Sequence, residues 1–116
     1  MNDIPQEIIM AWEKRKGPLV FTTADANGVP NSIYATCVVL CGCDTVIVAD
    51  NYFDKTRKNI LNGGKKGSIL FITEEGNAYQ LKGEIEYHTE GPIYDLMKKH
   101  NPPKHPGHAA AALKIE

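Results

Sequence analysis

Turn-forming residues divide this chain at short intervals, and that spacing limits the folds open to it more than any other feature. Residues 25–28, 41–44 and 75–77 are rich in Gly, Asn and Asp, which favour tight turns. The runs between them are rich in β-branched and aromatic residues, which favour strands. The predicted strands cover residues 19–24, 31–40, 45–49, 68–73 and 78–90. Hairpins are expected to join them, with the first three runs forming a meander.

Three short helices are expected beside these strands. Asp3 and Gln6 have the spacing of a capping box, which predicts the start of a first helix. Asp54 is a candidate N-cap for a second helix over residues 55–62, which Gly63-Gly64 would end. A third helix is predicted over residues 93–100.

Two segments bear on how the strands assemble. Gly83 interrupts the long fifth run and predicts a bulge or bend. Residues 109–115 fit a helix by propensity or a last strand by position. Five or six strands joined mostly by hairpins suggest a small barrel, because closure removes exposed sheet edges. An open antiparallel α+β sandwich is the alternative from pattern alone. The length of 116 residues suits a single domain over residues 1–116.

Charge and cysteine content narrow the classes of function. The net charge is −1, from 13 basic and 14 acidic residues, so no general positive field draws the chain to nucleic acid or to an anionic membrane. The apolar runs are too short to span a bilayer, and the first residues lack the pattern of a signal peptide. Three cysteines, an odd number, argue against a disulfide framework. We expect a cytoplasmic protein without nucleic-acid or membrane partners.

The segment after the third predicted strand carries the most chemistry. A helix that starts near Asp54 presents unpaired N–H groups, which bind anions. Lys55 adds a positive charge and Thr56 adds a hydroxyl donor. Further basic residues follow closely in the sequence, namely Arg57, Lys58, Lys65 and Lys66. The segment therefore predicts a phosphate site, and a solvated helix with a basic outer face is the alternative.

The pattern Lys-Thr-x-x-Asn-Ile over residues 55–60, placed directly after the third strand, resembles the pyridoxamine 5′-phosphate oxidase-like family of FMN-binding split barrels. The resemblance covers nearly the whole chain and includes the leading helix, Gly28-Val29-Pro30 and Gly83. It implies a mainly β fold, a six-stranded antiparallel split β-barrel of Greek-key topology with short flanking helices. It also implies a homodimer that holds two FMN molecules at its interface.

The resemblance assigns cofactor-binding residues by position. The phosphate ligands of the family match Lys55 and Thr56, and the strand that passes along the flavin matches Ser32, Ile33 and Tyr34. The strand end whose backbone faces the ring matches Val48, Ala49 and Asp50. A glutamine of the long strand matches Gln80.

The resemblance also indicates which function to expect. The pyridoxamine-phosphate oxidases of this family are longer and carry extra basic residues and a further C-terminal segment. We therefore expect an FMN-dependent oxidoreductase or electron carrier with a small-molecule redox substrate or an electron partner, and not a true pyridoxamine-phosphate oxidase. No acid–base motif stands out, so no catalytic residue is assigned. A non-enzymatic module on the same barrel, holding haem, a deazaflavin or no cofactor, is the alternative.

The cysteines and histidines do not predict a metal site. Cys37, Cys41 and Cys43 lack the paired knuckle of a zinc site and are expected to be small packing residues. His100, His105 and His108 gather in a proline-rich segment without a local cysteine or carboxylate to complete a tetrahedral set. An exposed, unliganded histidine loop is therefore expected.

Overall fold

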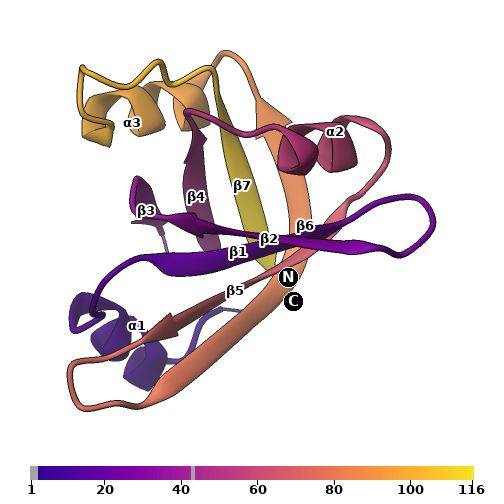
Figure 1. Ribbon diagram of the computed structural model, residues 1–116. Coiled ribbons are helices and arrows are strands. Elements are labelled where there is room, and N and C mark those ends of the chain that lie inside the picture. The colour runs from indigo at the N-terminus through magenta and orange to yellow at the C-terminus, as the bar shows by residue number, and fades with distance from the viewer. Residues whose placement is uncertain (1–2, 43) are drawn as a thin grey trace.

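The computed structural model describes residues 3–42 and 44–116, in which one curled antiparallel sheet is flanked by three short helices (Figure 1). The helices are α1 (Gln6–Glu13), α2 (Lys55–Leu61) and α3 (Pro92–His100). The strands are β1 (Leu19–Ala24), β2 (Pro30–Ala35), β3 (Val38–Cys41), β4 (Thr45–Asp50), β5 (Lys66–Ile72), β6 (Ala78–His88) and β7 (Ala109–Ile115).

The order of the strands shows how the sheet closes. It runs β2-β1-β5-β6-β7-β4-β3, and every neighbouring pair is antiparallel. β2 and β3 follow each other in the chain, yet they occupy opposite ends of this order. Ala35 lies opposite Leu19 of β1, whereas Val38 lies opposite Val48 of β4. The chain thus crosses from one sheet edge to the other at residues 36–37, and the sheet forms a split barrel as predicted.

The prediction of one strand over residues 31–40 was wrong in detail. The run is divided at residues 36–37, which gives seven strands where six were expected. The first three runs therefore form two hairpins at opposite sheet edges and not a three-stranded meander. The composition is strand-like throughout, but a strand ends where its hydrogen-bonding partner changes, and composition does not record that change.

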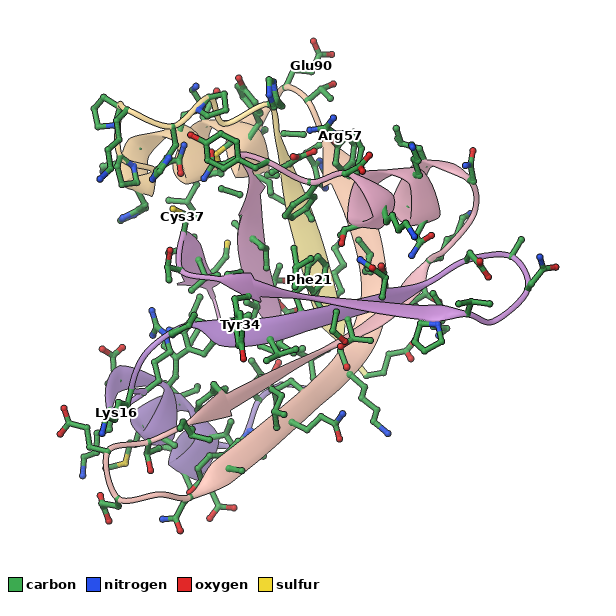
Figure 2. All side chains as sticks on the ribbon, in the orientation of Figure 1. Lys16, Phe21, Tyr34, Cys37, Arg57 and Glu90 are labelled. Carbon is green, nitrogen blue, oxygen red and sulfur yellow. The ribbon has the colours of Figure 1, made fainter. Side chains whose placement is uncertain are left out.

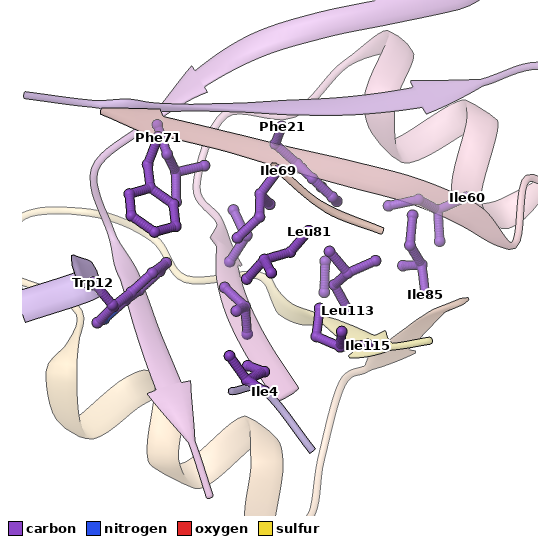
Figure 3. Packing of buried hydrophobic residues seen from close by; sticks show 14 of the residues in the cluster. Ile4, Trp12, Phe21, Ile60, Ile69, Phe71, Leu81, Ile85, Leu113 and Ile115 are labelled. Atoms are coloured by element: carbon purple, nitrogen blue, oxygen red, sulfur yellow. The ribbon is translucent and has the colours of Figure 1, made fainter. Parts of the chain in front are cut away.

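The core fills the interior of the curled sheet (Figure 3). Phe21 and Ile69 are completely buried, and Trp12 packs edge-on against Phe71 with ring centroids 5.4 Å apart. α1 therefore covers one end of the barrel, while α2 and α3 lie at the other end (Figure 1). The predicted capping box of Asp3 and Gln6 is absent, because Pro5 is the N-cap residue and no side chain caps the helix.

The last segment is the strand β7, inserted between β4 and β6. Its alanines are fully buried on both faces of the sheet. Ala111 faces the barrel core, whereas Ala110 packs with Met97 of α3. Burial on both faces therefore outweighs the high helix propensity of alanine, and the segment forms a strand.

Of the bulge or bend predicted at Gly83, the bulge is absent, since Gly83 pairs in register with both Gly67 and Ile115. A Cβ atom at this position would lie 1.9 Å from the carbonyl oxygen of Lys114. The glycine is required because β6 and β7 approach closely at this position.

Candidate functional site

The residues around Lys55 form a cavity, here called the Lys55 cavity, between α2 and the β1–β2 hairpin. Its volume is about 220 Å³. The lining residues are Asp25, Val29, Pro30, Asn31, Lys55, Lys58 and Asn59. Lys55 forms no ion pair with any residue in the described ranges, so its charge is available to a ligand.

The Lys-Thr-x-x-Asn pattern orients α2 over this cavity. Thr56 is completely buried, and its hydroxyl oxygen accepts a hydrogen bond of 3.0 Å from the side-chain amide of Asn31. The amide of Asn59 donates a 3.0 Å hydrogen bond to the hydroxyl of Thr23. These two bonds attach the helix to β2 and β1 and leave Lys55 facing outward. In this arrangement the hydroxyl of Thr56 supports Asn31 and lies behind the cavity wall.

Acidic residues near the cavity are partly occupied by other bonds. One carboxylate oxygen of Asp25 accepts backbone N–H bonds of 2.9 Å from both Asn27 and Val29. Asp54 is the N-cap residue of α2, as predicted, but its side chain forms no capping hydrogen bond and lies 3.5 Å from the ammonium of Lys58 on an exposed surface. Since such surface pairs contribute little, the cavity keeps a positive edge at Lys55 and Lys58.

A second cavity, here called the Tyr52 cavity, lies further along β2 and has a volume of about 200 Å³. Its lining is mostly apolar and aromatic. The lining residues are Ile33, Tyr34, Ala35, Thr36, Cys37, Ala49, Asn51, Tyr52, Phe53 and His105. Both cavities thus lie between β2 and the segment 49–59. Asn31, Ile33 and Ala35 alternate along β2, so the same face of this strand contributes to both.

The structure gathers some of the residues assigned from the sequence and separates others. Ile33, Tyr34 and Ala49 line the Tyr52 cavity, and Lys55 lines the cavity named after it. Ser32 lines a hollow of about 230 Å³ on the outer face of β1 and β2. Val48 is completely buried in the core and lines neither cavity. Gln80 is exposed on β6, opposite Leu70, and lines neither cavity.

Asp50 and Arg57 form an ion pair with a buried carboxylate, which the sequence did not reveal. The guanidinium donates hydrogen bonds of 2.7 and 2.8 Å to the two carboxylate oxygens, and Tyr87 of β6 donates a third. Arg57 reaches back from α2 toward the end of β4 (Figure 2). The basic charge expected from Arg57 is therefore neutralised, and Lys66 is likewise paired, with Glu84 and Glu116.

The titration behaviour of this cluster follows from its bonding. Burial alone would raise the pKa of Asp50, but hydrogen bonds from Arg57, Tyr87 and the backbone of Phe53 outweigh burial and hold that pKa below its usual value. Burial and the bond to Asp50 raise the pKa of Tyr87 to about 12. The bond to Asp50 also raises the pKa of Arg57. Asp50 therefore stays ionised and ties β4, α2 and β6 together.

A second polar cluster fixes the proline-rich loop over residues 101–108 next to the Tyr52 cavity. The side-chain amides of Asn51 and Asn101 exchange two hydrogen bonds of 3.0 Å, and both residues are buried. Asn51 also accepts a 2.8 Å bond from the backbone N–H of Gly107. His105 of this loop lies at the cavity wall, where its Nδ1 is 3.1 Å from the hydroxyl of Tyr52. No sequence signal linked these residues, which are about fifty positions apart.

The predicted exposure of the histidines holds for His100 and His108 but not for His105, which is half-buried. Cys37 and Cys41 are half-buried and pack against the cluster of Ile47, Ala49, Met97 and Ala110, as expected, whereas Cys43 lies outside the described residues. Within residues 3–42 and 44–116, no three His, Cys, Asp or Glu side chains converge as a metal site would require.

None of the three helices within residues 3–42 and 44–116 has the length and apolar character needed to cross a membrane.

Comparison with known proteins identifies the family. Residues 6–116 match the family model described as pyridoxamine 5′-phosphate oxidase. The chain belongs to the pyridoxamine 5′-phosphate oxidase family. This match covers the whole barrel, including α2 and both cavities, and confirms the resemblance found in the sequence.

Individual proteins resemble this chain in fold or in sequence. HupZ of Group A Streptococcus superposes with a TM-score of 0.82 at 28% identity, covering 97% of this chain and 90% of that chain. An FMN-binding protein of Syntrophomonas wolfei gives a TM-score of 0.69 at 22% identity, covering 95% and 87%, a likeness of fold alone. An uncharacterized protein of Methanocaldococcus jannaschii is 32% identical over 99 residues, 83% of this chain. This chain spans only 64% of the length of that relative.

Proposed function

We propose that this chain is an FMN-binding flavoprotein that acts as an oxidoreductase or an electron carrier. The observation that carries the proposal is the pair of cavities between β2 and the segment 49–59, one with a positive edge and the other apolar and aromatic. This order of surfaces suits a molecule with a phosphate at one end and a planar ring at the other. When bound, FMN supplies hydride and single-electron transfer, while the protein supplies binding and orientation.

The spacing of the cavities suits the cofactor. Asn31 lines the Lys55 cavity and Ala35 lines the Tyr52 cavity. Four residues of a strand span about 13 Å, which is comparable with the distance between the phosphate and the ring system of FMN. Lys55 holds the phosphate and Asn31 is placed to donate to it after a small shift of its bond to Thr56. Ile33 and Ala49 offer apolar surface to the ring, and the exposed backbone of β2 can bond its polar edge.

The remaining assignments follow from this placement. Tyr34 lines the Tyr52 cavity and can therefore contact the ring. Ser32 and Gln80 lie on the outer surface of the barrel and line neither cavity, so we propose that they contact a cofactor only where two chains meet. Family membership defines the fold and not the substrate. The Tyr52 cavity has no lysine or arginine in its lining, and we propose that its substrate is not pyridoxamine phosphate.

A titration tests the cofactor. Purified protein is expected to be yellow, and the apo-protein is expected to quench the fluorescence of added FMN. Lys55→Ala is expected to raise the Kd for FMN roughly tenfold or more, since a charge-assisted bond to the phosphate is lost. Lys65→Ala removes the same charge from an exposed position outside the cavity and is the matched control. A colourless protein that ignores FMN contradicts the proposal.

We further propose that the chain forms a homodimer through the outer face of β2, β1 and β5. Tyr34, Val20 and Leu70 lie side by side across these strands, in register. Tyr34 is 78% exposed and Leu70 is 40% exposed, and Ile72 extends the same apolar face. Exposed apolar side chains in such a contiguous row favour association, and a self-complementary face suits a symmetric dimer.

Haem is the second candidate ligand, and His105 is the observation that favours it. This half-buried imidazole stands at the wall of an otherwise apolar cavity, and its Nδ1 is bonded to Tyr52. Imidazole is a common haem ligand, and a bond at the other nitrogen orients it. Titration with haem separates the two candidates, because a Soret band that His105→Ala abolishes, together with no FMN binding, would favour haem.

A further inference from the structure

The β1–β2 turn beside the Lys55 cavity is built around Asp25, a half-buried residue of the cavity lining. Its Oδ1 accepts the backbone N–H groups of Asn27 and Val29, each at 2.9 Å. Its own N–H donates a 3.0 Å bond to the carbonyl oxygen of Val29. Its Oδ2 accepts no hydrogen bond from the described part of the chain. The turn therefore fixes a carboxylate at the cavity and leaves one oxygen of it for a ligand.

Two lysines of α2 share this cavity with the carboxylate. Lys55 and Lys58 both line it, and neither ammonium forms an ion pair with Asp25 among the ion pairs of the described residues. Charges of opposite sign thus border one cavity without meeting each other. Ammonium groups only donate hydrogen bonds, and a carboxylate only accepts them. A ligand that engages both sides must therefore carry an anionic group and a hydrogen-bond donor close together.

The two asparagines of the cavity lining add acceptors. The side-chain amide of Asn31 donates to Thr56, and that of Asn59 donates to Thr23, each at 3.0 Å. Their NH₂ groups are thus engaged with the fold, whereas neither side-chain carbonyl oxygen accepts a hydrogen bond in the regions that the structure describes. An amide oxygen accepts from a hydroxyl as a carboxylate does. The cavity therefore combines cationic donors on one helix with several oxygen acceptors around them.

We propose that the Lys55 cavity recognises a phosphate ester whose neighbouring carbons carry hydroxyl groups, and that Asp25 selects for those hydroxyls. The phosphate lies against Lys55, and a hydroxyl beside it donates to Oδ2 of Asp25 in a charge-assisted bond. An ester without hydroxyls is repelled by the same carboxylate and gains no bond from it. In FMN the ribityl chain places hydroxyls beside the phosphate. That identification rests on the proposed function, whereas the preference for a hydroxylated ester rests only on the cavity.

The test compares glycerol 3-phosphate with propyl phosphate in FMN-free protein. The two esters have the same carbon skeleton and the same charge, and they differ only in the hydroxyls. Binding is followed by NMR through the backbone amide signals of residues 55–59, and FMN is titrated separately. The wild type is expected to bind glycerol 3-phosphate roughly tenfold more tightly than propyl phosphate, because only the first ester donates to Asp25.

Asp25→Asn separates selection from a purely structural role. Asparagine keeps an oxygen for the two backbone bonds, since Asn and Asp form the same turn. The variant is expected to bind propyl phosphate more tightly than the wild type does, and its preference for glycerol 3-phosphate is expected to fall below roughly twofold. A structural role would weaken both esters alike. Asp54→Asn, the matched control, removes a carboxylate that lies outside the cavity lining, and is expected to keep the tenfold preference.

The possible failures are distinguishable. If the wild type binds both esters equally, or if Asp25→Asn keeps the preference, selection by Asp25 is overturned, and FMN binding in the separate titration still supports the flavoprotein. If neither ester shifts the signals of residues 55–59 although FMN binds, the inference is overturned and the phosphate of FMN lies outside this cavity. If glycerol 3-phosphate is preferred through Asp25 while FMN does not bind, the inference stands and the proposed cofactor is wrong.

Discussion

Asp50 and Arg57 join the end of β4 to α2 through two hydrogen bonds of 2.7 and 2.8 Å. The carboxylate is completely buried, whereas 35% of the Arg57 side chain is exposed. The pair therefore sets the position of the helix that carries Lys55. Residues 51–53, which directly follow Asp50, line the Tyr52 cavity, and Lys55 of the same helix as Arg57 lines the other cavity.

The two halves of this pair are expected to respond unequally to mutation. Arg57→Gln leaves a buried carboxylate with only Tyr87 and a backbone amide as partners, and is expected to cost about 3 kcal/mol of unfolding free energy. Asp50→Asn leaves a guanidinium that can turn to water, and is expected to cost about 1.5 kcal/mol. Urea denaturation of both variants measures the difference. Equal losses of unfolding free energy would show that the buried carboxylate is not destabilising when Arg57 is removed.

Acid stability is expected to depend on the same carboxylate. The pKa of Asp50 is lowered in the native state from its ordinary value of 3.8, because hydrogen bonds outweigh the opposing effect of burial. The unfolded state therefore takes up the proton first, and the stabilisation is complete above that ordinary value and is lost as pH falls through the native pKa. Unfolding free energies measured from pH 7 to pH 2 are expected to fall more steeply for the wild type than for Asp50→Asn. Parallel curves would contradict this.

Local sequence chemistry predicted much of the fold but less of the site. Turn residues and β-branched runs located β1, β4, β5 and β6, since those signals act within a few residues. The division of residues 31–40 and the strand β7 depend on which distant strands pair, and no local pattern contains that. Lys55 and Asn59 were recognisable as a motif. Asp50 and Tyr87 are 37 positions apart, so only the barrel brings them together.

Gly83 is expected to tolerate no side chain. Gly83→Ala places a Cβ against the carbonyl of Lys114, and relief requires β6 and β7 to separate. We expect a loss of about 3 kcal/mol or more, in the range that marks overpacking at a buried site. Gly76→Ala is the control, since its Cβ would meet open space and only the positive φ of 89° is strained. This control is expected to cost about 1 kcal/mol. Thermal denaturation of both variants shows whether close packing or local backbone strain causes the larger loss of stability.

The outer face of β1, β2 and β5 is expected to control self-association. Leu70→Lys places a charge at the β5 end of the row formed with Val20 and Tyr34, where a second chain would have to desolvate it. Sedimentation velocity is expected to show a dimer for the wild type and a monomer for this variant. Met10→Lys, at a residue that is 57% exposed on α1, adds the same charge away from this face and is expected to remain dimeric. A wild type that sediments as a monomer at every concentration would contradict the proposed dimer. It would also leave Ser32 and Gln80 without access to a shared cofactor, because these side chains lie on the outer surface of the single barrel and line neither cavity.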